Sequence, residues 1–146
     1  MLIRALILLC LFASPVAAGE THFVKMLNRG EAGRMVYEPD FLRIQPGDTV
    51  KFLATDPSHN AYLINDFFPE GAEQFKGSID EEIEVTLTIP GHYGVKCSPH
   101  YSMGMVMLIT VGDAPLSEVV LPEGVPRRSQ NRFEDIIARG DDASGS

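Results

Sequence analysis

The segment from Cys97 to Met105 places side chains that bind soft metal ions within nine residues. It holds a thiol at Cys97, an imidazole at His100 and thioethers at Met103 and Met105, and a second imidazole, His59, lies thirty-eight residues upstream. One thiolate, two imidazoles and a weak axial thioether form the ligand set of copper sites that transfer single electrons. The residue types and their spacing therefore predict a copper site, with Met103 and Met105 as alternatives for the axial position.

Each of these residues also has an ordinary structural role. A single cysteine is usually a core residue, and His59 and His100 alone would be turn or loop residues. A zinc site would need a stronger fourth ligand than a thioether. Catalysis by Cys97 and His100 would need an oriented base and access for a substrate, and the sequence indicates neither. His22 and His92 are expected at the surface or at strand ends, away from any metal.

Residues 1–18 have the pattern of a secretory signal peptide. Arg4 precedes an apolar run over residues 5–13, and Val16 and Ala18 are small residues at the −3 and −1 positions of a cleavage site. An uncleaved membrane anchor is the alternative, but the run is short for a membrane span. A signal peptide would direct export to an oxidising setting, and its cleavage would leave Cys97 as the single thiol, so a bound metal would protect that thiol from oxidation.

The composition is that of one globular domain with a short tail. The 146 residues are 45% hydrophobic and 22% charged, with a formal net charge of −8. An acidic balance argues against a nucleic-acid partner, and no membrane attachment is expected after cleavage.

Short apolar or alternating segments separated by Pro-Gly turns predict an antiparallel sandwich or barrel over residues 19–112. The expected strands are residues 22–27, 41–44, 49–53, 83–89, 92–97 and 105–111. A turn is expected at residues 28–30 and a short helix near residues 71–75.

The pattern becomes helical after Gly112. Residues 117–121 predict a helical turn or more, and Pro126 suits the start of a second helix. Phe133 and Ile136 share a face of that helix, and Gly140 is a candidate C-cap. We expect residues 113–140 to pack on the sandwich as a helical extension, followed by a disordered tail at residues 141–146.

These segments together resemble the pseudoazurins, a family of small periplasmic cupredoxins. The resemblance rests on residues 22–28, 35–39, 46–50, 58–60, 69–73 and 94–105, and it extends to the C-terminal helices. It implies an all-β fold, an eight-stranded Greek-key sandwich with copper at one end and two C-terminal α-helices. By position, the ligands of one type 1 copper ion are His59, Cys97, His100 and axial Met105, so the resemblance selects Met105 over Met103.

The resemblance also implies a function. The chain would be a periplasmic one-electron shuttle cycling between Cu(I) and Cu(II), a monomer and not an enzyme. Its partners would be c-type cytochromes and a denitrification reductase that acts on nitrite or nitrous oxide. A periplasmic copper carrier or storage protein is the alternative. A multicopper oxidase would need more than the four histidines present.

Further residues are expected to support this site. The Asn60 side chain would bond to Ser98, and backbone N–H groups would point at the Cys97 sulfur. An apolar patch would surround the ring edge of His100 for weak partner docking, formed by Pro99, Met103, Gly104 and, unless it only packs in the core, Met35. The family surrounds this patch with lysines, whereas here only Lys76, Lys96, Arg29 and Arg34 remain. We therefore expect mainly apolar contact and weak electrostatic steering.

Overall fold

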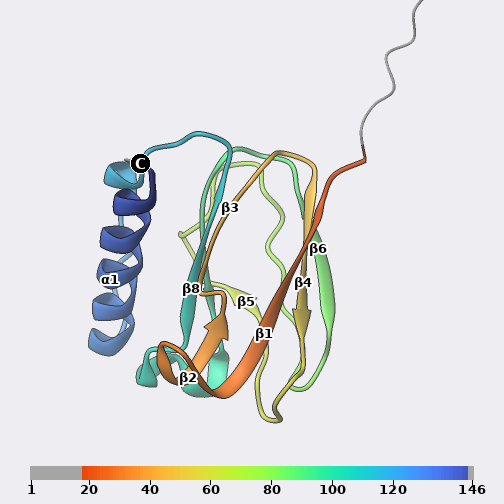
Figure 1. Ribbon diagram of the computed structural model, residues 1–146, viewed down its shortest axis with the longest axis vertical. Helices are drawn as coiled ribbons and strands as arrows, with labels where there is room; N and C mark the ends of the chain where they lie inside the picture. Colours follow the sequence, from red (N-terminus) through yellow and green to blue (C-terminus); the bar gives the residue numbers. More distant parts are fainter. Residues whose placement is uncertain (1–17, 145–146) are drawn as a thin grey trace, which may run out of the picture.

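The computed structural model describes residues 18–144, so residues 1–17 of the predicted signal peptide lie outside it. In this part of the chain, eight strands form two four-stranded sheets, ordered β2-β1-β4-β6 and β3-β8-β7-β5. The strands are β1 (Thr21–Gly30), β2 (Gly33–Glu38), β3 (Phe41–Ile44), β4 (Asp48–Leu53), β5 (Tyr62–Leu63), β6 (Ile83–Leu87), β7 (Gly91–Lys96) and β8 (Val106–Val111). The sheets lie face to face in Figure 1, which confirms the predicted sandwich. The expectation of antiparallel pairing was wrong for two pairs, because β1 with β4 and β3 with β8 run parallel.

The core between the sheets follows from alternation along the strands. Val24 and Met26 of β1, and Val50 and Phe52 of β4, are fully buried, while the side chains between them are exposed or half-buried. Successive side chains of a strand point to opposite faces of its sheet, so these four residues line one apolar face. They belong to the same buried cluster as Cys97 and several residues of β7 and β8.

β8 is buried at all six positions because both of its faces are covered. Met107 and Ile109 face the core between the sheets, while Val106 and Leu108 belong to a second cluster with Phe133. Phe133 lies on helix α1 (Arg127–Ser144), which runs alongside β8 in Figure 1. The continuous apolar run that predicted a buried strand thus reflects contact with the helix on its outer face.

The C-terminal extension contains one α-helix, so the expectation of two was wrong. The first helical signal forms only a short 3-10 turn, η2 (Leu116–Glu118), and Val119 after it is extended, with φ −67° and ψ 121°. Pro122 disfavours helical backbone at the residue before it, which prevents the turn from growing. Among residues 18–144, no helix is long and apolar enough to cross a membrane.

Gly140 does not end helix α1, which continues to Ser144. The first four residues of the predicted disordered tail are therefore helical, and residues 145–146 lie outside the described part. Gly140 is buried, and a Cβ there would lie 2.5 Å from Cδ1 of Leu116 and 3.2 Å from the ring of Phe41. Because residue 140 has no side chain, helix α1 can pack closely against Leu116 and Phe41, and Gly140 does not cap the helix.

Two strands were not expected, one turn lies elsewhere, and one expected helix is absent from its residues. β1 continues through residues 28–30, and the chain turns at Glu31 and Ala32 instead. β2 lacks a clean alternation, because Val36 and Tyr37 are both buried and Met35 has a φ of +51°. β5 has only two residues, and residues 71–75 form no helix.

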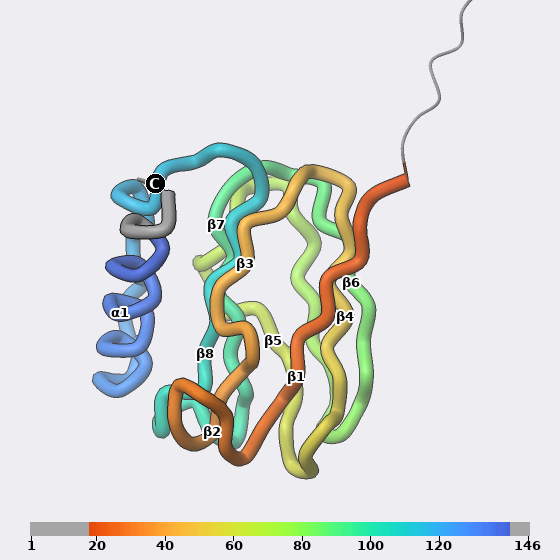
Figure 2. Tube along the Cα trace, in the orientation of Figure 1, coloured from red at the N-terminus to blue at the C-terminus, as the bar shows by residue number. Residues whose placement is uncertain are grey.

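The candidate ligands gather at one end of the sandwich. In Figures 1 and 2, the turn between β1 and β2 and the 3-10 helix η1 (Ser98–Met103), drawn in blue-green, lie at the bottom, and the start of β1 lies at the top.

Candidate metal centre

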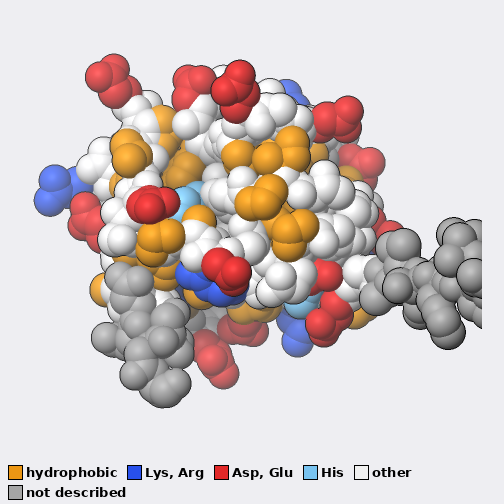
Figure 3. Space-filling view, turned by 90° about the horizontal axis from the view of Figure 1, so that it is seen from above, with side chains coloured by type: hydrophobic (Ala, Val, Ile, Leu, Met, Phe, Trp, Pro, Cys, Tyr) orange, Lys and Arg blue, Asp and Glu red, His pale blue; other side chains and the backbone are white. Residues whose placement is uncertain are grey.

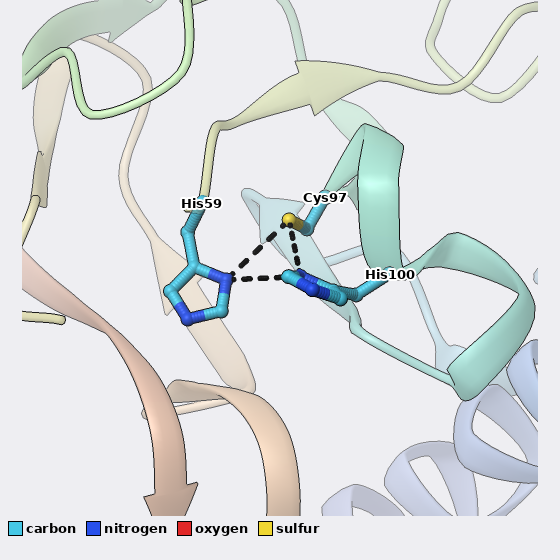
Figure 4. Close-up of side chains that lie close together, drawn as sticks. All are labelled: His59, Cys97 and His100. Carbon is cyan, nitrogen blue, oxygen red and sulfur yellow. Dashed lines mark hydrogen bonds between the residues drawn. The ribbon is translucent and has the colours of Figure 1, made fainter. Parts of the chain in front are cut away.

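Three predicted side chains converge from two loops at this end. His59 lies in the loop between β4 and β5, Cys97 directly follows β7, and His100 lies in η1. Nδ1 of His59 is 3.1 Å from Nδ1 of His100, and Sγ of Cys97 is 3.7 Å and 3.5 Å from these two nitrogens. Figure 4 shows the two rings and the sulfur facing one another.

This triangle has the dimensions of a metal site. A point equidistant from three atoms with these separations lies about 2.0 Å from each, close to the length of an imidazole–metal bond, about 2.0–2.1 Å. A thiolate bond is slightly longer, about 2.3 Å. His59 and Cys97 are fully buried and His100 is half-buried, so the centre is closed on most sides. The donor set, one sulfur and two imidazole nitrogens, fits a soft or borderline ion.

Asn28 orients the ring of His59, and the sequence did not reveal this role. Nε2 of His59 donates to Oδ1 of Asn28 at 2.9 Å, which leaves the lone pair of Nδ1 directed at the other two groups. Burial lowers the pKa of His59, and the charge of His100 lowers it further, which favours the neutral ring that metal binding requires. Asn28 was assigned to a turn, and only its place in β1 brings it to His59.

Asn60 ties the two ligand loops together, as predicted. Its Oδ1 accepts the backbone N–H of Ser98 at 2.7 Å, and its Nδ2 donates to Oγ of Ser98 at 3.2 Å and to the Gly77 carbonyl at 3.0 Å. The carbonyl of Asn60 accepts the phenol O–H of Tyr37 at 2.6 Å, a contact that the sequence did not indicate. Burial raises the pKa of Tyr37 well above its ordinary range, so the phenol is a permanent donor.

The Cys97 thiol lies in an apolar setting with backbone donors. Burial raises its pKa, and hydrogen bonds from the backbone N–H groups of Asn60 and His100 oppose this effect. These contributions agree with the expectation of N–H donors near the sulfur, and the same His100 N–H also donates to the Cys97 carbonyl at 3.2 Å. A bound cation would complete the stabilisation of the thiolate that burial alone disfavours.

The two candidate axial methionines differ sharply in burial. Met105 is fully buried in the same cluster as Cys97, and its carbonyl accepts the Cys97 N–H at 3.0 Å. Met103 is 41% exposed at the end of η1. Met105 thus lies inside the centre's apolar wall, and Met103 lies on the surface.

The surface beside the centre differs in part from the predicted patch. Nε2 of His100 has no hydrogen-bond partner in the described chain, and no buried polar atom there lacks one, so this nitrogen reaches the surface. Pro99 and Met103 of the same segment are also exposed. Gly104 is buried instead, because its backbone lies against Arg128 of α1. Met35 is half-buried and packs against the core cluster.

The remaining histidines lie outside the centre. His22 contacts the Asp48 carboxylate at 3.0 Å, and His92 contacts Oγ1 of Thr110 and the Pro115 carbonyl at 2.9 and 3.1 Å. This agrees with the expectation that neither belongs to a metal site.

Helix α1 supports the ligand loop directly. Oγ of Ser129, which is fully buried, donates to the Tyr101 carbonyl in η1. On the opposite flank, the ammonium of Lys96 lies 4.8 Å from the ring centre of Tyr101 and 4.9 Å from that of Tyr62. The loop that carries His100 is thus held between a helix and a side-chain stack.

Comparison with known proteins agrees with this architecture. Residues 24–112 match the family described as "Copper binding proteins, plastocyanin/azurin family". The chain is 47% identical to a pseudoazurin of Paracoccus pantotrophus over 133 residues, 90% of each chain. It is 45% identical over 119 residues to a putative pseudoazurin of Rhizobium leguminosarum bv. viciae, covering 81% of this chain and 78% of the relative.

A solved pseudoazurin structure from Sinorhizobium meliloti superposes with a TM-score of 0.75 and 44% identity, covering 82% of this chain and 95% of that one. The fold, the converging ligand types and these relatives lead to one conclusion: the chain belongs to the pseudoazurins, blue-copper electron-transfer proteins with a cupredoxin fold.

Proposed function

We propose that this chain is a one-electron shuttle whose single copper ion is held by His59, Cys97 and His100, with Met105 as the axial ligand. The observation that carries the assignment is the triangle of two Nδ1 atoms and one Sγ with sides of 3.1 to 3.7 Å. The burial of Met105 beside Cys97 supports its axial role over that of the exposed Met103.

Copper in such a site supplies a Cu(I)/Cu(II) couple, since thiolate suits the reduced ion and imidazole tolerates both oxidation states. The chain's own groups hold the ligand geometry unchanged between the two states. Asn28 fixes the ring of His59, and Asn60 links its loop to Ser98. His100 is the route for the electron, because its Nε2 edge reaches the surface.

The ligand assignment is tested by substitution and visible spectroscopy. Copper-loaded wild-type chain should show an intense blue band that a reductant bleaches and ferricyanide restores. Cys97→Ser should lack that band when copper is added, because the thiolate is the donor of the charge-transfer transition. Retention of an intense band in Cys97→Ser would contradict the assignment.

A second pair of variants tests the axial position. Met105→Gln should keep copper and shift the reduction potential, because the axial contact tunes an ion that the trigonal ligands hold. Met103→Gln is the matched control and should leave the potential unchanged. A larger shift in the control would move the axial assignment to Met103.

A copper carrier or storage protein remains the second candidate, but burial argues against it. Transfer of the metal requires ligands that a recipient can reach, whereas His59 and Cys97 are both fully buried. Slow loss of copper to a chelator together with fast electron exchange would favour the shuttle. Fast loss of copper would favour the carrier.

The shuttle would work in the periplasm as a monomer after removal of residues 1–18. It would accept electrons from c-type cytochromes and donate them to a nitrite or nitrous oxide reductase. Stopped-flow electron transfer with each purified candidate, together with mass spectrometry of the exported chain for the cleavage site, tests these assignments. Transfer no faster than to an unrelated redox protein would remove a candidate from the list of partners.

Docking would combine an apolar contact with a local rim of positive charge. Arg29 and Arg34 face each other across β1 and β2, both are exposed, and neither forms an ion pair within residues 18–144. Like charges directly opposite each other destabilise a sheet, so a partner's carboxylates would relieve this repulsion. The opposite end of the molecule carries many Asp and Glu side chains around its edge in Figure 3.

The docking surface is tested by rate constants measured across an ionic-strength series. Met103→Glu should slow transfer to a reductase strongly, and Lys76→Glu should slow it modestly, because charges are screened beyond about 10 Å at 0.1 M salt. A steep fall of the wild-type rate with salt, together with an unchanged rate in Met103→Glu, would show that electrostatics dominates.

A further inference from the structure

A buried phenol lies one hydrogen bond behind the copper ligands. Tyr37 of β2 is 1% exposed, and its O–H donates to the backbone carbonyl of Asn60 at 2.6 Å. Asn60 directly follows His59, and its side chain bonds to Ser98, the residue after Cys97. Its backbone N–H also opposes the rise that burial causes in the pKa of the Cys97 thiol. We propose that Tyr37 is a positioning residue, which sets the reduction potential of the centre by fixing the backbone of Asn60. This inference rests on the proposed copper ligands.

The contacts of Asn60 divide into two groups. Its side chain bonds to Gly77 and Ser98, which fixes the amide group. Its carbonyl oxygen has the Tyr37 phenol as its donor, which fixes the main chain. The phenol holds the peptide that follows Asn60, so it restrains rotation of the Asn60 backbone and, through it, the N–H of the same residue.

The hydroxyl of Tyr37 does more than packing requires. The ring fills the core and meets Phe52 edge to face, with centroids 6.0 Å apart, and a phenylalanine would make the same contact. A buried phenol needs an acceptor, and the acceptor here is a carbonyl adjacent to a ligand. Removing the hydroxyl would leave that carbonyl unsatisfied, and the nearby backbone would have to move to find another donor.

The direction of the effect follows from electrostatics. An N–H dipole that points at the thiolate favours the reduced state, which carries one more negative charge at the centre. Tyr37→Phe should loosen Asn60, weaken this dipole and lower the potential. We expect the ratio of reduced to oxidised protein at a fixed mediator potential to fall several-fold. A tenfold fall would correspond to about 59 mV for one electron.

The chain supplies a matched control. Tyr93 of β7 is also 1% exposed, and its O–H donates to the Ile89 carbonyl at 2.7 Å. Ile89 lies in the connection between β6 and β7, away from the ligand loops. Tyr93→Phe therefore deletes the same kind of buried bond without touching Asn60. Both variants should lower the melting temperature by similar amounts, and only Tyr37→Phe should change the potential.

The experiment measures the potential and the visible band of copper-loaded wild type, Tyr37→Phe and Tyr93→Phe. A parallel measurement follows the amide proton shift of Asn60 in the reduced, diamagnetic state. We expect that shift to move upfield in Tyr37→Phe alone. If the wild type shows no reversible blue band, the proposed function fails, and the inference falls with it. If the wild type behaves as proposed but both variants share its potential and Asn60 shift, Tyr37 only packs and the inference is overturned.

Discussion

Replacing Asn28 by alanine should weaken the centre without touching a ligand. Nε2 of His59 donates to the Asn28 amide oxygen at 2.9 Å, and His59 is fully buried. In Asn28→Ala the ring N–H loses its acceptor, and the ring can turn so that Nδ1 no longer faces Cys97. The backbone N–H of residue 28, which donates to Asp56, is retained, so β1 itself should be undisturbed.

Two general magnitudes bound the loss of copper affinity in Asn28→Ala. A buried donor left without a partner costs about 1–3 kcal/mol. Loss of a group that orients a ligand typically lowers metal affinity about 10- to 100-fold, which is about 1.4–2.7 kcal/mol. Because the Asn28 side chain lies at the surface, water can replace part of its bond, and we expect the lower end, about tenfold.

The assay is competition for copper against a chelator of known affinity, with the release rate measured alongside. Asn28→Asp is the matched control, since its carboxylate can still accept from His59 Nε2 and should preserve binding. Arg29→Ala, one residue along β1, controls for surface changes in the strand. Equal copper affinity in wild type and Asn28→Ala would refute the claim that this hydrogen bond orients His59.

Three further outcomes are expected. Phe133→Ala should lower the free energy of unfolding by about 3–5 kcal/mol, measured in urea, because the fully buried ring packs 5.1 Å from that of Phe67. Hydrogen bonds from His22 first, and then from two backbone N–H groups, lower the pKa of Asp48, so its folded form binds a proton less readily than the unfolded chain. Its contribution to stability is thus present above about pH 4 and is lost as the pH falls further, and Asp48→Asn should flatten this acid dependence in urea titrations. Arg34→Gln should raise the melting temperature slightly by removing the repulsion with Arg29, whereas a decrease would mean that Arg34 has a stabilising partner.

The elements that could be predicted were those whose pattern has one physical explanation. Residues 49–53 alternate because one face of β4 meets the core, and residues 105–111 are apolar throughout because both faces of β8 are covered. β2 could not be predicted, since positive φ at Met35 breaks the alternation. The helix expected at residues 117–121 was wrong because the apolar residues near η2 pack without helical backbone.

Three of the four proposed ligands, Cys97, His100 and Met105, lie in a nine-residue segment and could be predicted from it, but the residues that support the centre could not. Cys97 and His100 lie three residues apart, so their proximity is local. Asn28 and Tyr37 reach the centre only through the pairing of β1 with its neighbours, and nothing near them in the sequence signals a metal. Long-range strand register decided these contacts, and a single sequence does not display that register.

The parallel pairing of β3 with β8 has a consequence for how the chain matures. This pairing places Phe41 opposite Leu108, which is distant in the sequence. The metal centre forms only when the closed sandwich brings the loop after β4 and the segment after β7 together. Contacts so distant along the chain form slowly, because a large loop must close before they are gained. Until then the Cys97 thiol is open to oxidants, while in the folded chain it is fully buried. A variant that is as stable as the wild type but slower to fold should therefore lose a larger fraction of its thiol to oxidants before metal binds.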